Sequence, residues 1–270
     1  MEGPARVELI FLHWYNFNVP TPFYHLDIAE SLLVQDDLPA GFRRLLEKHK
    51  SAFTFGNVAP DVQVISGQKR AETHFYNLPV EHSALTPWDR IFQLYPELFQ
   101  PQTLSPVRAV FLAGYFCHLQ ADWYWAVEIY EPNFGVTATW NTFRQRLYLH
   151  NVLRSYMDLQ GFACINGYTR ESLEQVALDQ WLPFAADNHL RAWRDLLADQ
   201  LKPGAEIQTV EVFASRQGIP PGTYYDLLNS DEALDREIFV QLPRYHLDTY
   251  RRNLINKNIV FLETYLQDLV

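Results

Sequence analysis

The chain has 270 residues, 48% hydrophobic and 20% charged, a composition ordinary for a globular protein with a sizeable core. Its formal net charge of −10 argues against nucleic-acid binding driven by phosphate neutralisation and against standing adsorption on anionic membranes. A metal-dependent nuclease stays compatible with this charge, because bound metal ions supply local positive charge. Aromatic residues, 15% of the chain, can fill a core or line a cleft for an apolar ligand.

Cysteine usage and the start of the chain bear on the compartment. Only Cys117 and Cys164 are present, too few for a disulfide-stabilised secreted domain. No apolar run reaches the roughly 20 residues of a membrane span. The start, MEGPARVELIFLHWYNF, has an acidic residue at position 2 and no small-residue cleavage pattern, so it does not look like a signal peptide. We therefore expect a cytoplasmic protein without a transmembrane segment.

In chain order, the first predicted helix begins after Thr21, a suitable N-cap, with Pro22 at its first position. Apolar residues at 28, 29, 32 and 33 continue a stripe that starts at His25, with the three- and four-residue spacing of a buried helix face. The pattern therefore places His25 on the inward face of this helix.

The next two segments differ in pattern. A second helix is expected over 39–49. The stretch AFTFGNVAPDV, residues 52–62, is broken by Gly, Asn and Pro, so we expect a loop that presents Asp61. A short segment, RAETHFY, follows and carries His74.

The longest central helix is predicted to start at Ser105 and Pro106, again a cap followed by proline. Its apolar stripe includes Val110, and both His118 and Asp122 fall on that stripe. Two potential metal-binding side chains therefore lie on the buried face of a core helix.

The second half of the chain is also expected to be helical. Helices are predicted over 138–158, 169–200 and 223–268, with a clear break at GIPPG, while 206–214 is expected to form a short strand or an extended loop. The predicted fold is all-α and multi-helix, a single domain with a core over 1–160 and a C-terminal helical extension over 161–270.

His118 and Asp122 form the central motif of the sequence. Residues four apart lie on one helix face, so an imidazole and a carboxylate at this spacing can hold one metal ion together. The spacing alone is weak, because a buried histidine more often simply forms a hydrogen bond with a helical aspartate. The metal hypothesis therefore depends on further ligands.

Three further residues supply them. An inward-facing His25 needs an acceptor or a metal, because burying an unpartnered imidazole is costly. Taken singly, Asp61 is an ordinary turn residue and His74 an ordinary partly buried histidine. With His118 and Asp122 the set has three imidazoles and two carboxylates, which suits zinc, although iron or manganese could also occupy it.

Four blocks of the sequence, in chain order, resemble the zinc-dependent phospholipase C family. They lie between about residues 20 and 126 and read TPFYHLDIAESLL, AFTFGNVAPDV, ETHFY and FLAGYFCHLQADWYW. The resemblance implies an all-α fold with metal ligands on helices, related to the single-strand-specific zinc nucleases. It also implies one metal site formed by the residues Asp61, His74, His118 and Asp122.

For a second site the resemblance implies His25 with Asp122, which would bridge two ions. The secreted phospholipases complete that site with a free N-terminal Trp, whereas about twenty residues precede the His25 helix here. A third family site uses a His six residues after the Asp and a later H-x-x-x-E pair. Glu128 stands at the first of these positions and could still bind metal, but the later pair reads His150 and Arg154. We therefore expect one or two zinc ions rather than three.

The residues His150 and Arg154 are candidates for substrate binding. Arg154 cannot bind a metal ion, but its planar guanidinium matches the oxygens of a phosphate. The alternative is that both residues form a helical ion-pair face with Asp158.

This set of residues predicts a phospholipase C-like zinc hydrolase acting on a small-molecule or lipid phosphoester through a metal-activated water. Asp61 is the candidate catalytic residue that positions or deprotonates that water. Aromatic residues at 123–125 and Tyr130 could line an opening for acyl chains, with core packing as the alternative. Two other functions stay open: a nuclease-like phosphoesterase, and a non-catalytic metal-binding helical protein with a degenerate site.

Overall fold

The computed structural model describes residues 21–80 and 85–270, and the secondary structure of these ranges is entirely helical. The predicted all-α fold is confirmed for this part of the chain. Residues 1–20, on which the predicted compartment depended, lie outside the described ranges. The α-helices are α1 (Pro22–Leu33), α2 (Ala40–Lys48), α3 (Lys50–Gly56), α4 (Gln63–Ser66), α5 (Arg70–His74), α6 (Pro87–Leu94), α7 (Pro106–Tyr124), α8 (Glu131–Asn133), α9 (Phe143–Cys164), α10 (Tyr168–Glu174), α11 (Asp187–Gln200), α12 (Thr209–Gln217), α13 (Pro221–Leu228), α14 (Asp231–Leu234) and α15 (Arg244–Leu266).

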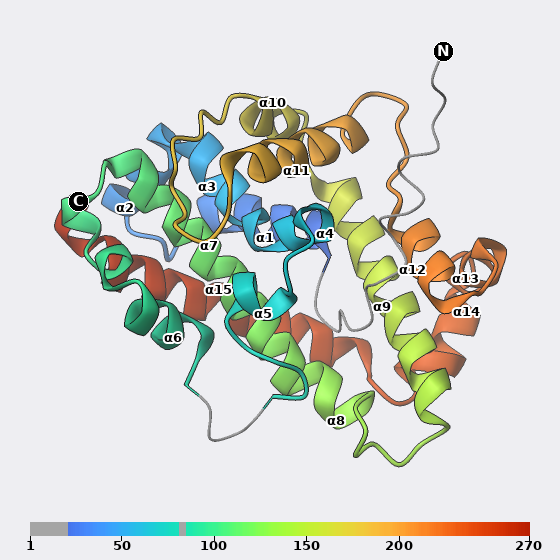
Figure 1. Cartoon of the computed structure of the whole chain (residues 1–270). Helices are drawn as coiled ribbons and strands as arrows, with labels where there is room; N and C mark the ends of the chain where they lie inside the picture. The colour runs from blue at the N-terminus through green and yellow to red at the C-terminus, as the bar shows by residue number, and fades with distance from the viewer. Residues whose placement is uncertain (1–20, 81–84) are drawn as a thin grey trace.

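Helix α7 is the central element of the fold. Its predicted start is confirmed, since the Ser105 side chain accepts a hydrogen bond from the Arg108 N–H. Every residue from Ala109 to Asp122 is buried, as expected for a helix that is apolar on nearly all sides. Helices α3 and α15 pack against α7, and α1 packs against α9, α15 and α3 (Figure 1). The predicted metal-binding pair therefore lies at the centre of the molecule.

The loop predicted over 52–62 is wrong, because residues up to Gly56 form α3 and Asp61 lies in a 3-10 helix, Ala59–Val62. Gly56 does not end the helix because of its flexibility; it lies where the backbone of α3 touches the backbone of α7. A Cβ atom at Gly56 would lie 2.2 Å from the Phe111 carbonyl oxygen, and one at Gly114 would lie 2.4 Å from the Phe53 carbonyl oxygen. The two glycines let the backbones of α3 and α7 touch, and this packing outweighs the low helix propensity of glycine.

Four predictions for the second half of the chain also need correction. The helix expected over 223–268 is divided into α13, α14, a π-helix over Asp235–Phe239 and α15. The helix expected over 138–158 begins at Phe143 and continues to Cys164. The single helix expected over 169–200 is two helices, α10 and α11, with 175–186 not helical between them. The stretch 206–214 contributes to helix α12 rather than to a strand, because Val210, Phe213 and Ala214 form a buried stripe at helical spacing.

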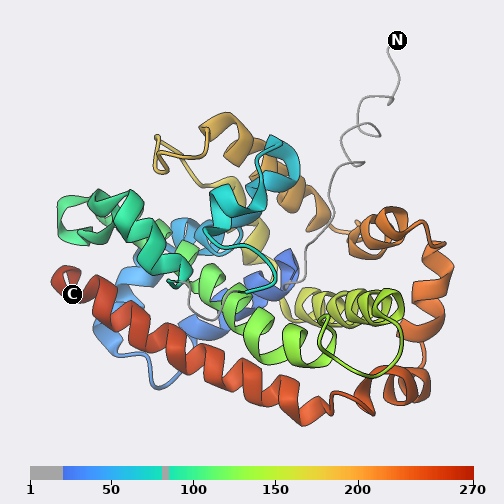
Figure 2. The same cartoon turned by 60° about the horizontal axis from the view of Figure 1, so that its bottom comes forward.

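The helices beyond residue 160 pack onto the first half of the chain. Helix α10 lies against α3, α12 against α9, and α15 against both α7 and α1. Figure 2 shows the long helix α15 running along one side of the molecule, beside α7. The division into a core over 1–160 and an extension over 161–270 stays a prediction.

Candidate metal centre

Helix α7 carries two of the candidate ligands. His118 Nε2 lies 3.5 Å from Asp122 Oδ2, as their spacing of one helical turn predicts. Both side chains are fully buried. The other ring nitrogen of His118, Nδ1, lies 2.7 Å from the carbonyl oxygen of Asn57, at the end of α3. A carbonyl oxygen can only accept, so Nδ1 carries the hydrogen and Nε2 keeps its lone pair for a metal ion.

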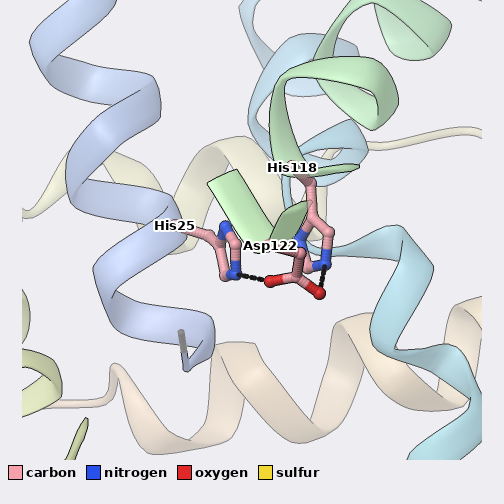
Figure 3. A group of neighbouring side chains, drawn as sticks. All are labelled: His25, His118 and Asp122. Atoms are coloured by element: carbon pink, nitrogen blue, oxygen red, sulfur yellow. Dashed lines mark ion pairs between the residues drawn. The ribbon is translucent and has the colours of Figure 1, made fainter. Parts of the chain in front are cut away.

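Helix α1 supplies the third ligand, His25. Its Nε2 lies 3.3 Å from Asp122 Oδ1, and its ring stacks on the His118 ring with 3.8 Å between centroids (Figure 3). Two imidazoles on separate helices therefore approach the same carboxylate from neighbouring positions. The predicted inward orientation of His25 is confirmed by its burial.

Asp158 of α9 determines where α1 begins, and thereby where His25 lies. Its Oδ1 accepts hydrogen bonds from the Phe23 N–H at 2.9 Å and the Tyr24 N–H at 3.1 Å. Its other oxygen accepts a hydrogen bond from the Thr209 hydroxyl. The first-turn N–H groups that Thr21 was expected to cap are thus satisfied by a carboxylate from another helix, and the Thr21 side chain makes no capping bond.

We expect Asp158→Ala to lower the free energy of unfolding by about 2–4 kcal/mol, because it leaves two buried N–H groups of α1 without an acceptor. The shift of α1 should also weaken metal binding through His25. Burial raises the pKa of Asp158, so the neutral amide of Asp158→Asn is a matched control that keeps an acceptor oxygen. Denaturant unfolding of both variants checks this. Equal stability of Asp158→Ala and the wild type would contradict it.

The 3-10 helix and α5 complete the centre with Asp61 and His74. His74 Nε2 lies 3.5 Å from Asp61 Oδ1, 3.1 Å from Asp122 Oδ2 and 3.2 Å from His118 Nε2. The Thr73 hydroxyl lies 3.0 Å from the other ring nitrogen of His74. Because His118 Nε2 holds a lone pair, its 3.2 Å approach to His74 Nε2 is favourable only with a proton or a cation between them.

The five side chains fit a metal ion. Their ligand atoms form two groups that share His118, and within each group these atoms lie within 4.8 Å of one another. One group holds His25, His118 and Asp122; the other holds Asp61, His74 and His118. Apart from their 3.3 Å approach to each other, His25 Nε2 and Asp122 Oδ1 are buried without a hydrogen-bond partner among the described residues, a cost that a bound cation would remove. Imidazole nitrogens with carboxylate oxygens are the ligands that zinc takes in proteins.

The electrostatics keep the two carboxylates and His25 in the ionisation states that metal binding requires, whereas the carboxylates of Asp122 and Asp61 raise the pKa of His118 against its burial, so that a metal ion would displace a proton there. Burial opposes the effect, but the charges and hydrogen bonds of the histidines, His118 first, hold the pKa of Asp122 well below its usual range. Against the same burial, the hydrogen bond from His74 and the nearby imidazole charges lower the pKa of Asp61 to about 2. Burial, together with repulsion from His118, lowers the pKa of His25 to about 4. At neutral pH both carboxylates are therefore ionised and His25 is neutral.

One residue at the centre, Arg70, was given no role by the sequence reasoning. It is the first residue of α5, and its Nη2 donates a hydrogen bond to Asp122 Oδ2 at 2.5 Å. Arg70 precedes His74 by four residues, so both side chains lie on the same face of α5. That R-x-x-x-H spacing is the signal in the sequence that could have pointed to it.

Two other predicted residues lie outside the two ligand groups. Glu128 is in the π-helix Trp125–Tyr130, where its carboxylate is 2.9 Å from Lys257 Nζ. Metal binding by Glu128 stays a prediction. His150 is fully buried, and its Nε2 accepts a hydrogen bond from Trp125 Nε1 at 2.9 Å. The ring also packs against the aromatic rings of Tyr130 and Phe134, and substrate binding by His150 likewise stays a prediction.

Arg154 lies on α9 between aromatic and polar neighbours. Its guanidinium carbon is 4.3 Å from the ring centroid of Phe213, and its Nη1 donates to Asn151 Oδ1 at 3.0 Å. Burial and repulsion from Arg216 lower the pKa of Arg154 to about 9, whereas the carboxylates of Asp61 and Asp122 oppose the shift. Substrate binding by Arg154 stays a prediction.

Comparison with known proteins agrees with this geometry. A family model described as zinc-dependent phospholipase C matches residues 21–174, which include all five ligands. No curated protein and no solved structure matches the chain. Within the described residues, the helices are all too short or too polar to cross a membrane. The family and the His/Asp groups together support a zinc-dependent hydrolase. Because the match covers more than half of the sequence, the chain belongs to the zinc-dependent phospholipase C family.

Proposed function

We propose that this protein is a phospholipase C-like phosphodiesterase that uses zinc bound by His25, Asp61, His74, His118 and Asp122. The observation that carries this proposal is the convergence of five buried ligands from α1, the 3-10 helix, α5 and α7. Two ligand groups that share one histidine leave room for one or two ions. A zinc centre of this composition suits the hydrolysis of phosphoesters.

When bound, zinc lowers the pKa of a coordinated water and polarises phosphoryl oxygens. We assign the proton transfer from the attacking water to Asp61. Its carboxylate is ionised at neutral pH and, at 6% relative exposure, is the most accessible of the five ligands. Asp122 is less suited to this role, because it is fully buried and engaged by Arg70 and the histidines.

Arg154 is proposed as a clamp for a phosphate oxygen. The carboxylates of Asp61 and Asp122 oppose the lowering of the pKa of Arg154, which favours the charged guanidinium that an anion requires. Its packing on Phe213 and its bond to Asn151 hold the planar group in one orientation, which reduces the entropy cost of binding an anion.

Apolar side chains packed beside the centre support a lipid substrate. Tyr76, whose hydroxyl accepts a hydrogen bond from Arg70, belongs to a small apolar cluster with Val80 and Ala126. Trp123, next to Asp122 in sequence, packs on Tyr76 with 5.2 Å between ring centroids and is only partly buried. Partly exposed apolar side chains beside a phosphate-binding centre suit the glycerol and acyl portion of a phospholipid.

The function is tested with zinc-loaded protein on three substrates: phosphatidylcholine in mixed micelles, bis(p-nitrophenyl) phosphate, and single-stranded DNA. We expect release of phosphocholine from the lipid and cleavage of the generic diester, both abolished by chelation and restored by zinc. Cleavage of DNA without cleavage of lipid would favour the nuclease-like alternative. No turnover of any substrate by protein that holds zinc would overturn the proposal and favour a non-catalytic metal-binding protein.

Zinc removal should also destabilise the protein. Binding to the folded state alone stabilises it by about 4 kcal/mol when free zinc is 1,000 times the dissociation constant. For a chain of this size we expect chelation to lower Tm by roughly 10 °C. Differential scanning calorimetry with and without chelator measures this, and added magnesium is the control, since Mg²⁺ prefers oxygen-only ligands. An unchanged Tm in protein shown to lose zinc would contradict the expectation.

A further inference from the structure

Arg70 is held against the metal centre by one of its terminal nitrogens. Nη2 donates hydrogen bonds to Asp122 Oδ2 at 2.5 Å and to the Tyr76 hydroxyl at 2.8 Å. The guanidinium carbon also lies 4.5 Å from the centroid of the Tyr76 ring. The side chain is 11% exposed. These contacts orient the planar group beside a carboxylate oxygen that is 3.1 Å from His74 Nε2.

The remaining nitrogens of the same guanidinium have no acceptor within residues 21–80 and 85–270. Nε and Nη1 are both buried, and neither makes a hydrogen bond to any residue in the described part of the chain. A buried N–H group without an acceptor is costly, and two on one guanidinium are expected only where a ligand or ordered water satisfies them. Nε and Nη1 lie at different edges of the planar guanidinium, each beside Nη2, so one anion can accept a hydrogen bond from one of them but not from both.

The position of these nitrogens narrows the identity of the anion. Arg70 pairs directly with Asp122, a member of one ligand group, and the centre carries a second carboxylate, Asp61, in the other group. Metal ions would neutralise both carboxylates. A tetrahedral anion at such a centre can share its oxygens between the metal ions and a guanidinium. A phosphoryl group provides this number of oxygens.

We propose that Arg70 is a substrate-binding residue whose Nη2 is anchored by Asp122 and Tyr76 while one of its other nitrogens, Nε or Nη1, donates a hydrogen bond to a phosphoryl oxygen of the substrate. This inference deepens the proposed function and rests on it. It also assigns Asp122 two tasks, binding of metal and orientation of Arg70. Lysine cannot replace Arg70 in this role, because a single ammonium cannot reach the anchor and hold the anion with the same geometry.

The experiment measures the affinity of zinc-loaded protein for inorganic phosphate by isothermal titration calorimetry, with zinc content determined on the same samples. We expect Arg70→Lys and Arg70→Gln to keep their zinc and to bind phosphate about 10- to 100-fold more weakly than the wild type. Arg244→Gln is the matched control, because that guanidinium pairs with Asp231 and Asp235 instead. This variant should bind phosphate as the wild type does.

Unchanged phosphate affinity in an Arg70 variant that retains zinc would overturn the proposal and leave Arg70 as a neutralising partner of Asp122. Arg70→Lys keeps a positive charge beside Asp122. Its phosphate affinity therefore tests the role of Arg70 even if Arg70→Gln loses zinc or stability. Absence of phosphate binding by the zinc-loaded wild type would also overturn the proposal. Phosphate binding that depends on Arg70, in protein that cleaves no diester, would sustain this role and defeat only the proposed activity.

Discussion

Replacing Asp122 by Asn is expected to release zinc from the centre and to lower phosphodiester turnover at least about 10³-fold. Asp122 reaches His25 through one oxygen and His74, His118 and Arg70 through the other, so its replacement affects most of the centre at once. The variant should also be less stable by about 3–5 kcal/mol, because the buried guanidinium loses its charged partner. Zinc content by elemental analysis, turnover and denaturant unfolding measure the three effects.

Two further variants make the Asp122 result specific. Asp248→Asn changes an exposed aspartate in the same way and should leave zinc, turnover and stability unchanged. Glu128→Gln decides whether that carboxylate binds a further ion, since loss of one zinc per chain would place it in an additional site. Full retention of zinc in folded Asp122→Asn protein would contradict the five-ligand centre and, with it, the proposed mechanism.

Replacing Gly114 by Ala is expected to lower the free energy of unfolding by about 3 kcal/mol or more. The added Cβ atom would lie 2.4 Å from the Phe53 carbonyl oxygen and about 3 Å from atoms of Asn57, and backbone atoms cannot move away as a flexible side chain can. Forcing α3 and α7 apart also draws the Asn57 carbonyl away from His118 Nδ1. Loss of such an orienting bond costs about 10- to 100-fold in metal affinity.

Gly222→Ala is the matched control for Gly114→Ala. Gly222 also lies in a helix, α13, but a Cβ atom there meets no neighbour within 4 Å. Its replacement should leave stability unchanged or raise it by up to about 1 kcal/mol. Chemical denaturation and zinc titration of the two variants check both expectations. Wild-type stability of Gly114→Ala would show that the contact between α3 and α7 can relax without cost.

Much of the centre could be predicted from the sequence, because the separation of two residues within a helix determines where their side chains lie relative to each other. The start of α7 follows from Ser105 and Pro106, and the separation of His118 from Asp122 places both on one buried face whatever the rest of the fold does. Likewise, the apolar stripe that begins at His25 determines its inward orientation. For these residues, local periodicity was sufficient.

Other features depended on contacts between segments distant in sequence. Residues 52–56 form a helix only because Gly56 and Gly114 allow α3 to pack directly on α7. The start of α1 is capped by Asp158, 135 residues from Phe23, although the sequence indicated Thr21 for that task. Capping preferences and helix propensities are worth only about 1 kcal/mol each, so tertiary packing readily overrides them.

Arg70 shows most clearly which features follow from the sequence and which follow from the tertiary structure. The sequence by itself determined the chemical types of the ligands and, through the spacing on α7, half of their arrangement. Only the tertiary structure decided that α1 and α5 meet at Asp122, that the 3-10 helix brings Asp61 to His74, and that Arg70 binds the Asp122 carboxylate. It also decided that Glu128 pairs with Lys257. The physical reason is that side-chain spacing within one helix follows from its geometry, whereas the docking of separate helices depends on close packing at their contact surfaces.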